Sequence, residues 1–362
     1  MNWESIRAEF PALANWTWLN TATFGQVPTR ARAAVDRHFA HRDETASADF
    51  LNWFDDVDAI RALVGRLINC EADDIAFAAN AASALSLFLG GMEWNEGDRI
   101  VTLRDEFPNQ YYFAASLASR GVELVELNEI NQLPDRTRAV ILSTVNYSNG
   151  YRPDVELVSQ LTHRAGALLY LDGTQSVGAL RFDIARVKPD MLAVDGYKWL
   201  LTPNGATFFY ISPDLRRTLH PSVMGWRSDK GWRSVDELQH GIPVLPDSAE
   251  KYEGGMLNFG AIYGAAESIR MMLEIGPERI EQRVLELAGL TAQILRQAGA
   301  SIVNDNTNVV AAHWHGRDVS ALAKQLQQQR IIVAARHGNL RVSPHFYNTE
   351  ADLERLRAAL AA

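Results

Sequence analysis

Short apolar runs alternate with longer segments of helical periodicity over the first two thirds of the chain. Seven runs have the length and continuous apolar character of buried strands: 74–79, 98–103, 122–127, 138–144, 167–172, 191–194 and 206–211. Helical patterns lie between several of them, at 80–92, 108–121 and 154–164. This alternation predicts an α/β fold in which a mostly parallel seven-stranded sheet lies between helices. Ligands bind such sheets beyond the carboxyl ends of the strands.

The pattern changes after about residue 254. Two long helical segments, 259–276 and 278–300, lead to three short apolar runs at 308–314, 331–336 and 340–344. We therefore predict a large domain over residues 15–254 and a smaller α+β domain over residues 255–362, which residues 1–14 are expected to join.

The composition fits a folded protein with a sizeable core, because 47% of the 362 residues are hydrophobic and 22% are charged. A net charge of -9 argues against nucleic acid or an anionic membrane as the main partner. No apolar stretch is long enough for a membrane span, and the first residues do not resemble a secretory signal. The single cysteine, Cys70, allows no internal disulfide, which predicts a cytoplasmic location.

Lys198 lies in the apolar stretch "VDGYKWLLTPNGATFFYI" at 194–211. Desolvation lowers the pKa of a lysine and makes its amine a nucleophile, although a lysine can also bury only its stem and keep its head in water. Asp172 ends an apolar run 26 residues earlier, in a "DG" pair that is also a common turn signal. Pyridoxal 5'-phosphate (PLP) uses such a pair: the lysine forms a Schiff base, and the carboxylate keeps the pyridine nitrogen protonated.

A phosphate site is predicted in "AFAANAASALSL", where a strand leads into a helix that begins with small residues. The N–H groups at a helix start, together with the helix dipole, bind anions. Asn80 is a candidate cap for this helix with or without phosphate, and the Ser83 hydroxyl is a candidate phosphate donor.

The segments "YLDGTQSVGA" and "DGYKWLLTPNGATFFYI" resemble the class V aminotransferase family of fold-type I PLP enzymes, which includes cysteine desulfurases, kynureninases and isopenicillin N epimerase-like proteins. The resemblance extends from "WLNTATFGQVP" at 18–28 to "LRVSPHFYNTEADLERL" at 340–356. It implies PLP as the cofactor, Lys198 as the Schiff-base lysine, and a homodimer with both active sites at the interface.

The resemblance also implies roles for individual residues. Asp172 matches the aspartate on the pyridine nitrogen, and Gln175 matches a position that contacts the ring oxygen or the phosphate. Ala82 and Ser83 match the phosphate-binding positions. Phe107 matches the aromatic residue that stacks on the cofactor ring.

Further positions match less completely. Tyr197 is expected near the phosphate, and Asn146 and Ser148 belong to a loop beside the ring, although the pattern does not say which of the two touches it. Met256 stands where relatives often have threonine, so only its backbone N–H is available to phosphate. Asp195 replaces a phosphate-binding serine, and its carboxylate is expected to point away from phosphate or to reach it through a bridging donor.

An arginine fork suits a substrate carboxylate. Arg341 and Arg336 are the candidates, and the resemblance of "LRVSPHFYN" to the kynureninase and epimerase-like pattern places Arg341 first. The leading hypothesis is an aminotransferase acting on a small α-amino acid, in which Lys198 takes the Cα proton and returns it at C4′. A β- or γ-lyase, an epimerase or racemase, and a non-catalytic PLP-binding protein are the alternatives, and no metal is expected.

Cysteine desulfurases use a thiolate from a late loop, and no cysteine follows Cys70. From this we expect that the chain is not a cysteine desulfurase.

Overall fold

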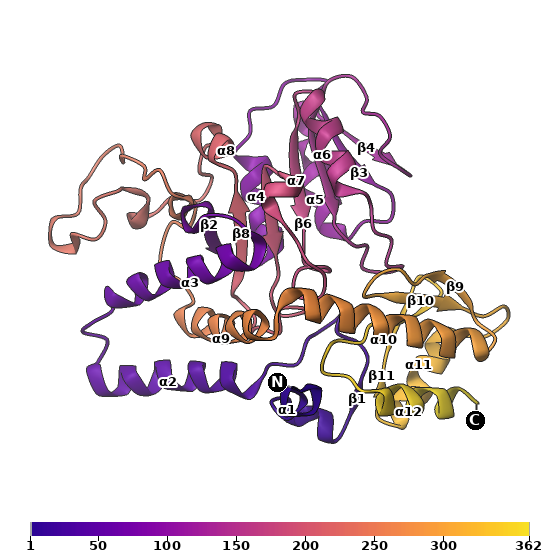
Figure 1. Cartoon of the computed structure of the whole chain (residues 1–362). Coiled ribbons are helices and arrows are strands. Elements are labelled where there is room, and N and C mark those ends of the chain that lie inside the picture. The colour runs from indigo at the N-terminus through magenta and orange to yellow at the C-terminus, as the bar shows by residue number, and fades with distance from the viewer. Residues whose placement is uncertain (1, 362) are drawn as a thin grey trace.

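A seven-stranded sheet forms the centre of the protein, in the computed structural model that describes residues 2–361 (Figure 1). The strands are β2 (Ile75–Ala78), β3 (Arg99–Leu103), β4 (Glu123–Leu127), β5 (Thr137–Ser143), β6 (Leu168–Asp172), β7 (Met191–Val194) and β8 (Thr207–Ile211). Their order is β2-β8-β7-β6-β5-β3-β4. Strand β8 is antiparallel to both neighbours, and the other pairs are parallel. The predicted sheet is confirmed.

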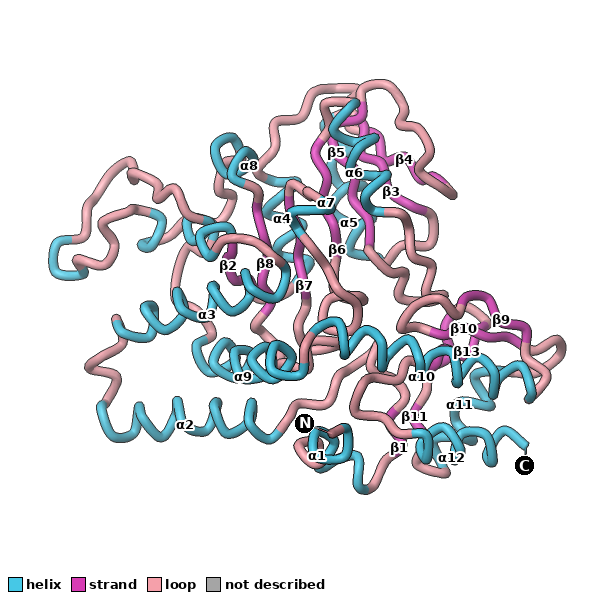
Figure 2. Tube along the Cα trace, in the orientation of Figure 1, coloured by secondary structure: helices cyan, strands magenta, loops and turns pink. Residues whose placement is uncertain are grey.

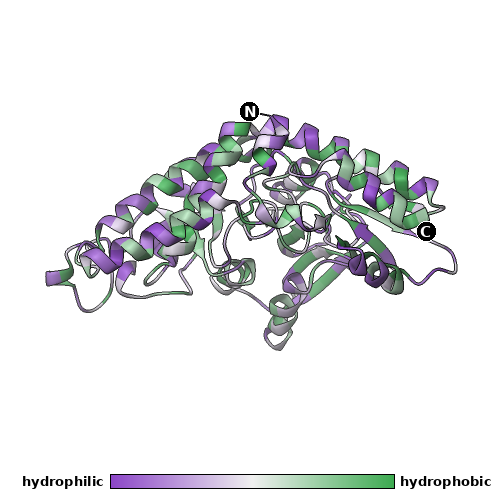
Figure 3. Ribbon diagram, turned by 90° about the horizontal axis from the view of Figure 1, so that it is seen from below, coloured by the Kyte–Doolittle hydropathy of each residue, from purple (hydrophilic) through white to green (hydrophobic). Residues whose placement is uncertain are grey.

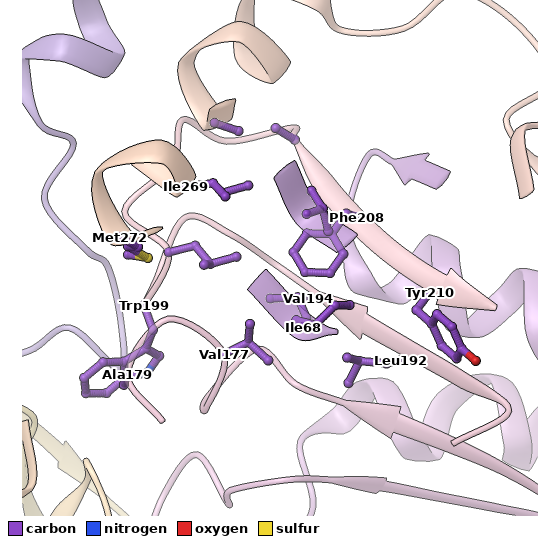
Figure 4. Packing of buried hydrophobic residues seen from close by; sticks show 14 of the residues in the cluster. Ile68, Val177, Ala179, Leu192, Val194, Trp199, Phe208, Tyr210, Ile269 and Met272 are labelled. Atoms are coloured by element: carbon purple, nitrogen blue, oxygen red, sulfur yellow. The ribbon is translucent and has the colours of Figure 1, made fainter. Parts of the chain in front are cut away.

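Both faces of this sheet are buried, because successive residues of a strand point to opposite sides. In β8, Phe208 and Tyr210 join one apolar cluster, while Phe209 and Ile211 join another. Helices α3 (Asn52–Ile68), α6 (Val155–Arg164), α7 (Ile184–Val187) and α9 (Phe259–Ile275) contribute to the first cluster. Helices α4 (Ala81–Gly90), α5 (Pro108–Ser116) and α8 (Pro213–Thr218) contribute to the second. Figure 4 shows side chains of the first cluster, with Phe208 and Val194 from the sheet beside Ile269 from α9.

Long helices extend along one side of the molecule. Helix α2 (Thr29–Thr45) packs against α9, and α10 (Pro277–Gln297) continues from α9 toward the C-terminal part (Figure 1). Seen from that side, these helices carry hydrophilic and hydrophobic residues in alternation, as helices with one buried face do (Figure 3).

The C-terminal part contains a second sheet with the order β12-β13-β10-β9. Its strands are β9 (Ser301–Asn304), β10 (Val310–His313), β12 (Ala334–Arg336) and β13 (Asn339–Val342), and helices α10, α11 (Val319–Gln328) and α12 (Glu350–Ala361) supply its apolar cover. Strand β1 (Thr17–Trp18) pairs with β11 (Ile331–Ile332), and helix α1 (Trp3–Arg7) is tied to α12 by an ion pair between Arg7 and Asp352 at 2.8 Å. The smaller α+β unit is thus present, and the domain limits at 14/15 and 254/255 remain a prediction.

Short 3-10 helices complete the structure: η1 (Pro11–Ala14), η2 (Ala72–Asp74), η3 (Leu117–Arg120), η4 (Trp226–Ser228), η5 (Val235–Glu237) and η6 (Ala249–Tyr252). The last three belong to a long, mostly irregular segment between α8 and α9, which projects from the body (Figure 2). Glu253 anchors its end, because this buried carboxylate accepts hydrogen bonds from Arg61 at 2.7 Å and from Arg227 at 3.0 Å. Burial opposes the charge of Glu253, but the two guanidinium groups more than offset it and lower its pKa.

Candidate active site

The carboxyl ends of β5, β6 and β7 bring the candidate residues to one edge of the large sheet. Asp172 is the last residue of β6, and Ser143 ends β5 beside it. Lys198 follows β7 in the loop that leads to β8. This edge is where ligands bind in open α/β sheets.

Lys198 lies in a partly buried position between two aromatic rings. Its Nζ atom is 5.7 Å from the centroid of the Phe107 ring and 5.6 Å from that of Tyr197. Burial lowers the pKa of Lys198 to about 8; the charges of Arg341 and Arg336 act in the same direction, while Asp172 opposes them. The amine can therefore be neutral in a pH range in which an ordinary lysine is charged.

A tight contact fixes the Lys198 loop to the segment before α2. Gly25 donates its N–H to the Tyr197 carbonyl at 2.9 Å, and a Cβ atom at Gly25 would lie only 1.9 Å from the Lys198 carbonyl oxygen. Only glycine permits this approach. The motif "TFGQVP" therefore positions the lysine from a distance in sequence.

Asp172 is buried, and its carboxylate accepts a hydrogen bond from the Thr174 N–H at 2.9 Å and a longer contact from Gln110 Nε2 at 3.5 Å. Behind it lies Glu106, a buried carboxyl group to which Ser143 donates its N–H at 2.7 Å and its hydroxyl at 2.6 Å. Burial raises the pKa of Glu106 to about 7. Neither Glu106 nor Gln110 was predicted as a site residue. The signal that could have found them is their closeness in sequence to Phe107, which was predicted.

Arg341 is a buried guanidinium group whose hydrogen-bond partners among residues 2–361 are all uncharged. It donates to the Tyr147 carbonyl, to the Thr23 hydroxyl, and to Asn20 Oδ1 at 3.2 Å. Its Nε atom has no hydrogen-bond partner, and no carboxylate of residues 2–361 forms an ion pair with it. Burial, and then the charge of Arg336, lowers the pKa of Arg341 to about 9. A buried positive charge without a counterion fits an anionic ligand.

Arg336 is less enclosed than Arg341. It is partly exposed, and its guanidinium donates to the neighbouring Ala335 carbonyl at 2.8 Å. Arg336 lies on β12 and Arg341 on β13, and these two strands pair as an antiparallel hairpin. Asn20 and Thr23, which hold Arg341 in place, come from the opposite end of the chain and were not predicted as site residues.

The start of α4 is shared between its own cap and Asp195. Asn80 Oδ1 accepts from the Ser83 N–H at 2.9 Å and from its hydroxyl at 3.0 Å, as expected of a cap. Asp195 Oδ1 accepts from the Ala81 N–H at 2.9 Å and from the Thr207 hydroxyl. Its carboxylate therefore points to the helix start rather than away from it, which corrects one of the two expected arrangements. Ala82 is partly exposed beside them, and its phosphate role stays a prediction.

Several predicted contacts are occupied by partners within the protein. The Gln175 side chain donates to the Ala22 carbonyl at 3.0 Å and accepts from the Trp199 indole at 2.9 Å, so it holds the residue next to Lys198. The Asn146 side chain accepts from the Ser148 N–H and hydroxyl, both at 2.8 Å, which shapes their loop.

Tyr197 and Met256 differ in exposure. Tyr197 is half-buried against Phe24, with ring centroids 4.8 Å apart, and burial raises its pKa to about 12. Met256 is 58% exposed on the loop that precedes α9. The phosphate roles of both residues stay predictions.

The residues present fit PLP. The partly buried Lys198 amine, the buried Asp172 carboxylate and the flat face of Phe107 are the groups that the cofactor requires, and they lie at one sheet edge. The helix start of α4 supplies N–H groups for phosphate, although Asp195 competes for them. A separate cleft of about 640 Å³ between α2, α3 and α9 is lined by none of these residues.

Residues 2–361 contain neither a candidate metal site nor a candidate membrane-spanning helix. No three His, Cys, Asp or Glu side chains in this range are grouped so that they could hold a metal ion. No helix in the described range is both long and apolar enough to span a membrane.

Comparisons with known proteins agree over the whole chain. A family model described as Aminotransferase class-V matches residues 29–356. A protein of Methanothermobacter thermautotrophicus named probable cysteine desulfurase is 26% identical over 396 residues, which cover 99% of this chain and 98% of the relative. The Bacillus subtilis protein named uncharacterized aminotransferase YcbU is 23% identical over 374 residues, which cover 99% and 97%.

A solved structure has the same fold. It is the complex between the cystine C–S lyase C-DES and its reaction product cysteine persulfide, and it matches with a TM-score of 0.88 and 21% identity, over 97% of this chain and 99% of that chain. The predicted PLP-dependent fold type I is confirmed.

The prediction that excluded cysteine desulfurases is wrong. A relative with that name matches this chain from end to end, although Cys70 is the single cysteine here. The exclusion assumed that the sulfur must pass to a cysteine of the same chain. Breaking the carbon–sulfur bond depends on the groups around the amino acid, and the cysteine count does not report on them.

Proposed function

Because the chain belongs to the Aminotransferase class-V family of PLP-dependent enzymes, we propose that it cleaves the carbon–sulfur bond of a small α-amino acid such as cysteine or cystine. The observation that carries the amino-acid assignment is Arg341, a buried guanidinium group near Lys198 that has no acidic partner among residues 2–361. The sulfur assignment is supported by the names of the relatives, of which one is called a probable cysteine desulfurase and one a cystine C–S lyase.

Each residue has a role that follows from its surroundings. PLP, when bound, supplies an electron sink for the pair of electrons that a departing Cα proton leaves behind. Lys198 would hold the cofactor covalently until the substrate amine displaces it, and the released neutral amine would then take the Cα proton; its lowered pKa keeps this form accessible. Asp172 binds the pyridine nitrogen and keeps its proton in place. Arg341 binds the substrate carboxylate with its fork, and Phe107 covers the ring and excludes water.

A second candidate function is transamination. Lys198 is the base beside the ring among the described residues, and a single base on one face can move a proton between two adjacent carbons. The Bacillus subtilis relative named as an aminotransferase also favours it.

Product analysis tests the proposal. Purified protein loaded with PLP is incubated separately with cysteine, cystine, S-methylcysteine and alanine, and sulfide, persulfide, methanethiol, keto acid, ammonia and alanine are measured. We expect sulfur release from the sulfur-containing amino acids, accompanied by either keto acid and ammonia or alanine, and none of this from the Lys198→Ala variant. Transfer of the amino group from alanine to an added keto acid, without sulfur release from any substrate, would establish transamination instead.

We also propose a two-fold homodimer in the cytoplasm, with both sites at the interface. Met256 is exposed, and a Cβ atom added at the neighbouring Gly255 would meet nothing within 4 Å, so the backbone of this loop is open to a second copy. Sedimentation of the PLP-loaded protein should give the mass of two chains, and a fully active monomer would refute the dimer.

A further inference from the structure

A tyrosine and a histidine from distant parts of the chain meet beside the arginine end of the site. Tyr147 lies in the loop after β5, and His337 lies at the turn between β12 and β13. The Tyr147 hydroxyl and His337 Nε2 are 2.7 Å apart, and the two rings meet edge to face at 5.9 Å. The pair connects the large sheet with the hairpin that carries Arg336 and Arg341.

Three observations place Tyr147 next to the reacting groups. Its ring meets that of Phe107 edge to face at 5.1 Å, and the same Phe107 ring lies 5.7 Å from Lys198 Nζ. Its carbonyl oxygen accepts a hydrogen bond from Arg341. The charges of Arg336 and Arg341 lower the pKa of Lys198 and also act to lower that of Tyr147, so the four groups share one electrostatic environment.

Tyr147 has the chemical state that an acid needs. Burial, the largest influence, raises its pKa above the ordinary value, although both arginines oppose this change. The phenol therefore keeps its proton at neutral pH. His337 is exposed, so the pair reaches from the interior to solvent, and the imidazole can pass a proton to the phenol oxygen from outside.

We propose that Tyr147 is the catalytic acid that protonates the departing sulfur, and that His337 positions its hydroxyl and restores its proton. Lys198 takes the Cα proton, the freed electron pair forms a Cα–Cβ double bond, and the Cβ–S bond breaks with its electrons on sulfur. The proton of the Tyr147 hydroxyl goes to that sulfur, and the phenolate takes a proton from His337, which regains one from water. The unsaturated amino acid reacts with one water to give a keto acid and ammonia. This role rests on the proposed carbon–sulfur cleavage.

The need for an acid depends on the leaving group, and this dependence is the test. Chloride leaves without protonation, whereas an alkyl thiolate is a poorer leaving group that gains from it. The PLP-loaded wild type and the variants Tyr147→Phe, His337→Gln and Tyr151→Phe are assayed for keto-acid formation with β-chloroalanine and with S-methylcysteine. Tyr151 is the matched control, because it lies four residues further along the same loop and burial also raises its pKa.

We expect Tyr147→Phe to lower kcat for S-methylcysteine about 10²-fold, a typical contribution of acid catalysis, and kcat for β-chloroalanine by less than about threefold. KM should change little, His337→Gln should show the same selectivity to a smaller extent, and Tyr151→Phe should match the wild type. The absorbance spectrum of bound PLP should be unchanged in all variants. This shows that a loss of rate does not reflect a loss of cofactor.

Two results would overturn the role of Tyr147 while leaving the proposed function intact. An equal loss with both substrates would make Tyr147 a structural residue, and no loss with either would place the acid elsewhere. A wild type that releases no sulfur from any amino acid and no keto acid from β-chloroalanine would overturn the proposed function, and the role of Tyr147 with it.

Discussion

Replacement of Arg341 separates its role in binding from its role in the fold. The drop of its pKa from 12.5 to about 9 corresponds to about 5 kcal/mol against the charged form in the folded protein. Because the folded pKa lies below the ordinary one, this cost is fully present below about pH 9, and it is lost progressively as the pH rises from about 9 to 12.5. A substrate carboxylate would offset much of it.

The expected size of the effect follows from the bonds that would be lost. Two charge-assisted hydrogen bonds to a carboxylate contribute about 1.5 to 3 kcal/mol each, so a total of about 3 to 6 kcal/mol corresponds to about 10²- to 10⁴-fold in kcat/KM. We expect Arg341→Met to lose this much for cysteine-class substrates. Its thermal midpoint without substrate should fall little, because removal of an unpaired buried charge offsets the three lost hydrogen bonds.

Steady-state kinetics and thermal unfolding of the same preparations check both parts. Arg336→Met is the matched control, because Arg336 is partly exposed on the same hairpin. We expect this variant to lose less than about tenfold in kcat/KM. Arg341→Lys keeps the positive charge but lacks the two-pronged guanidinium, so its kcat/KM should lie between those of the other two variants. A larger loss for the Arg336 variant than for the Arg341 variant would reverse the assignment of the carboxylate site.

Four other replacements or conditions test the remaining groups. The rate at which cofactor-free protein captures PLP covalently, followed by absorbance and by borohydride labelling of Lys198, should rise with pH and level off near 8, because the amine is neutral above its lowered pKa; a rise that continues past pH 10 would contradict this. Asp172→Ala should lower kcat about 10²- to 10³-fold in the product assay, since the pyridine proton loses its partner, and near-normal turnover would reduce Asp172 to a turn residue. Asp195→Ser should strengthen PLP binding in an equilibrium titration, because it removes a negative charge from the start of α4; weaker binding would show that the carboxylate supports the site. Glu253→Gln should destabilise the protein by about 3 to 5 kcal/mol in urea unfolding, because Arg61 and Arg227 stay buried without a full counterion, and an unchanged midpoint would contradict this.

The large sheet could be predicted because a parallel sheet that is covered on both faces leaves continuous apolar runs in the sequence. Helix α2 gave no comparable signal. It buries only Ala31, Ala34 and His38, so it carries no broad apolar stripe, and its position depends on packing against α9. No element was predicted between residues 29 and 68, although α3 has a clear amphipathic pattern there.

The position of Asp172 was predictable because it ends an apolar strand, and Lys198 follows the next strand at the same edge of the sheet; the roles of both stay predictions. Site residues whose hydrogen-bond partners lie far away in the sequence could not be predicted. Asn20 and Thr23 bind Arg341 across more than 300 residues, and no local pattern records this contact. The cysteine count gave a wrong exclusion of cysteine desulfurases for a different reason. It shows whether this chain could accept the sulfur, but it says nothing of how the carbon–sulfur bond of the substrate is broken.

The positions of the charges support the proposal that this edge of the sheet acts on an amino acid. Asp172 ends β6, and Arg341 on β13 forms no ion pair with any carboxylate of residues 2–361. Lys198 lies within the influence of both, and burial lowers its pKa more than Asp172 raises it. An amino acid carries a carboxylate for Arg341 and a Cα proton for Lys198. The bound substrate would therefore neutralise the arginine that depresses the lysine pKa, and its arrival would make the amine a stronger base at the moment when a proton must be taken.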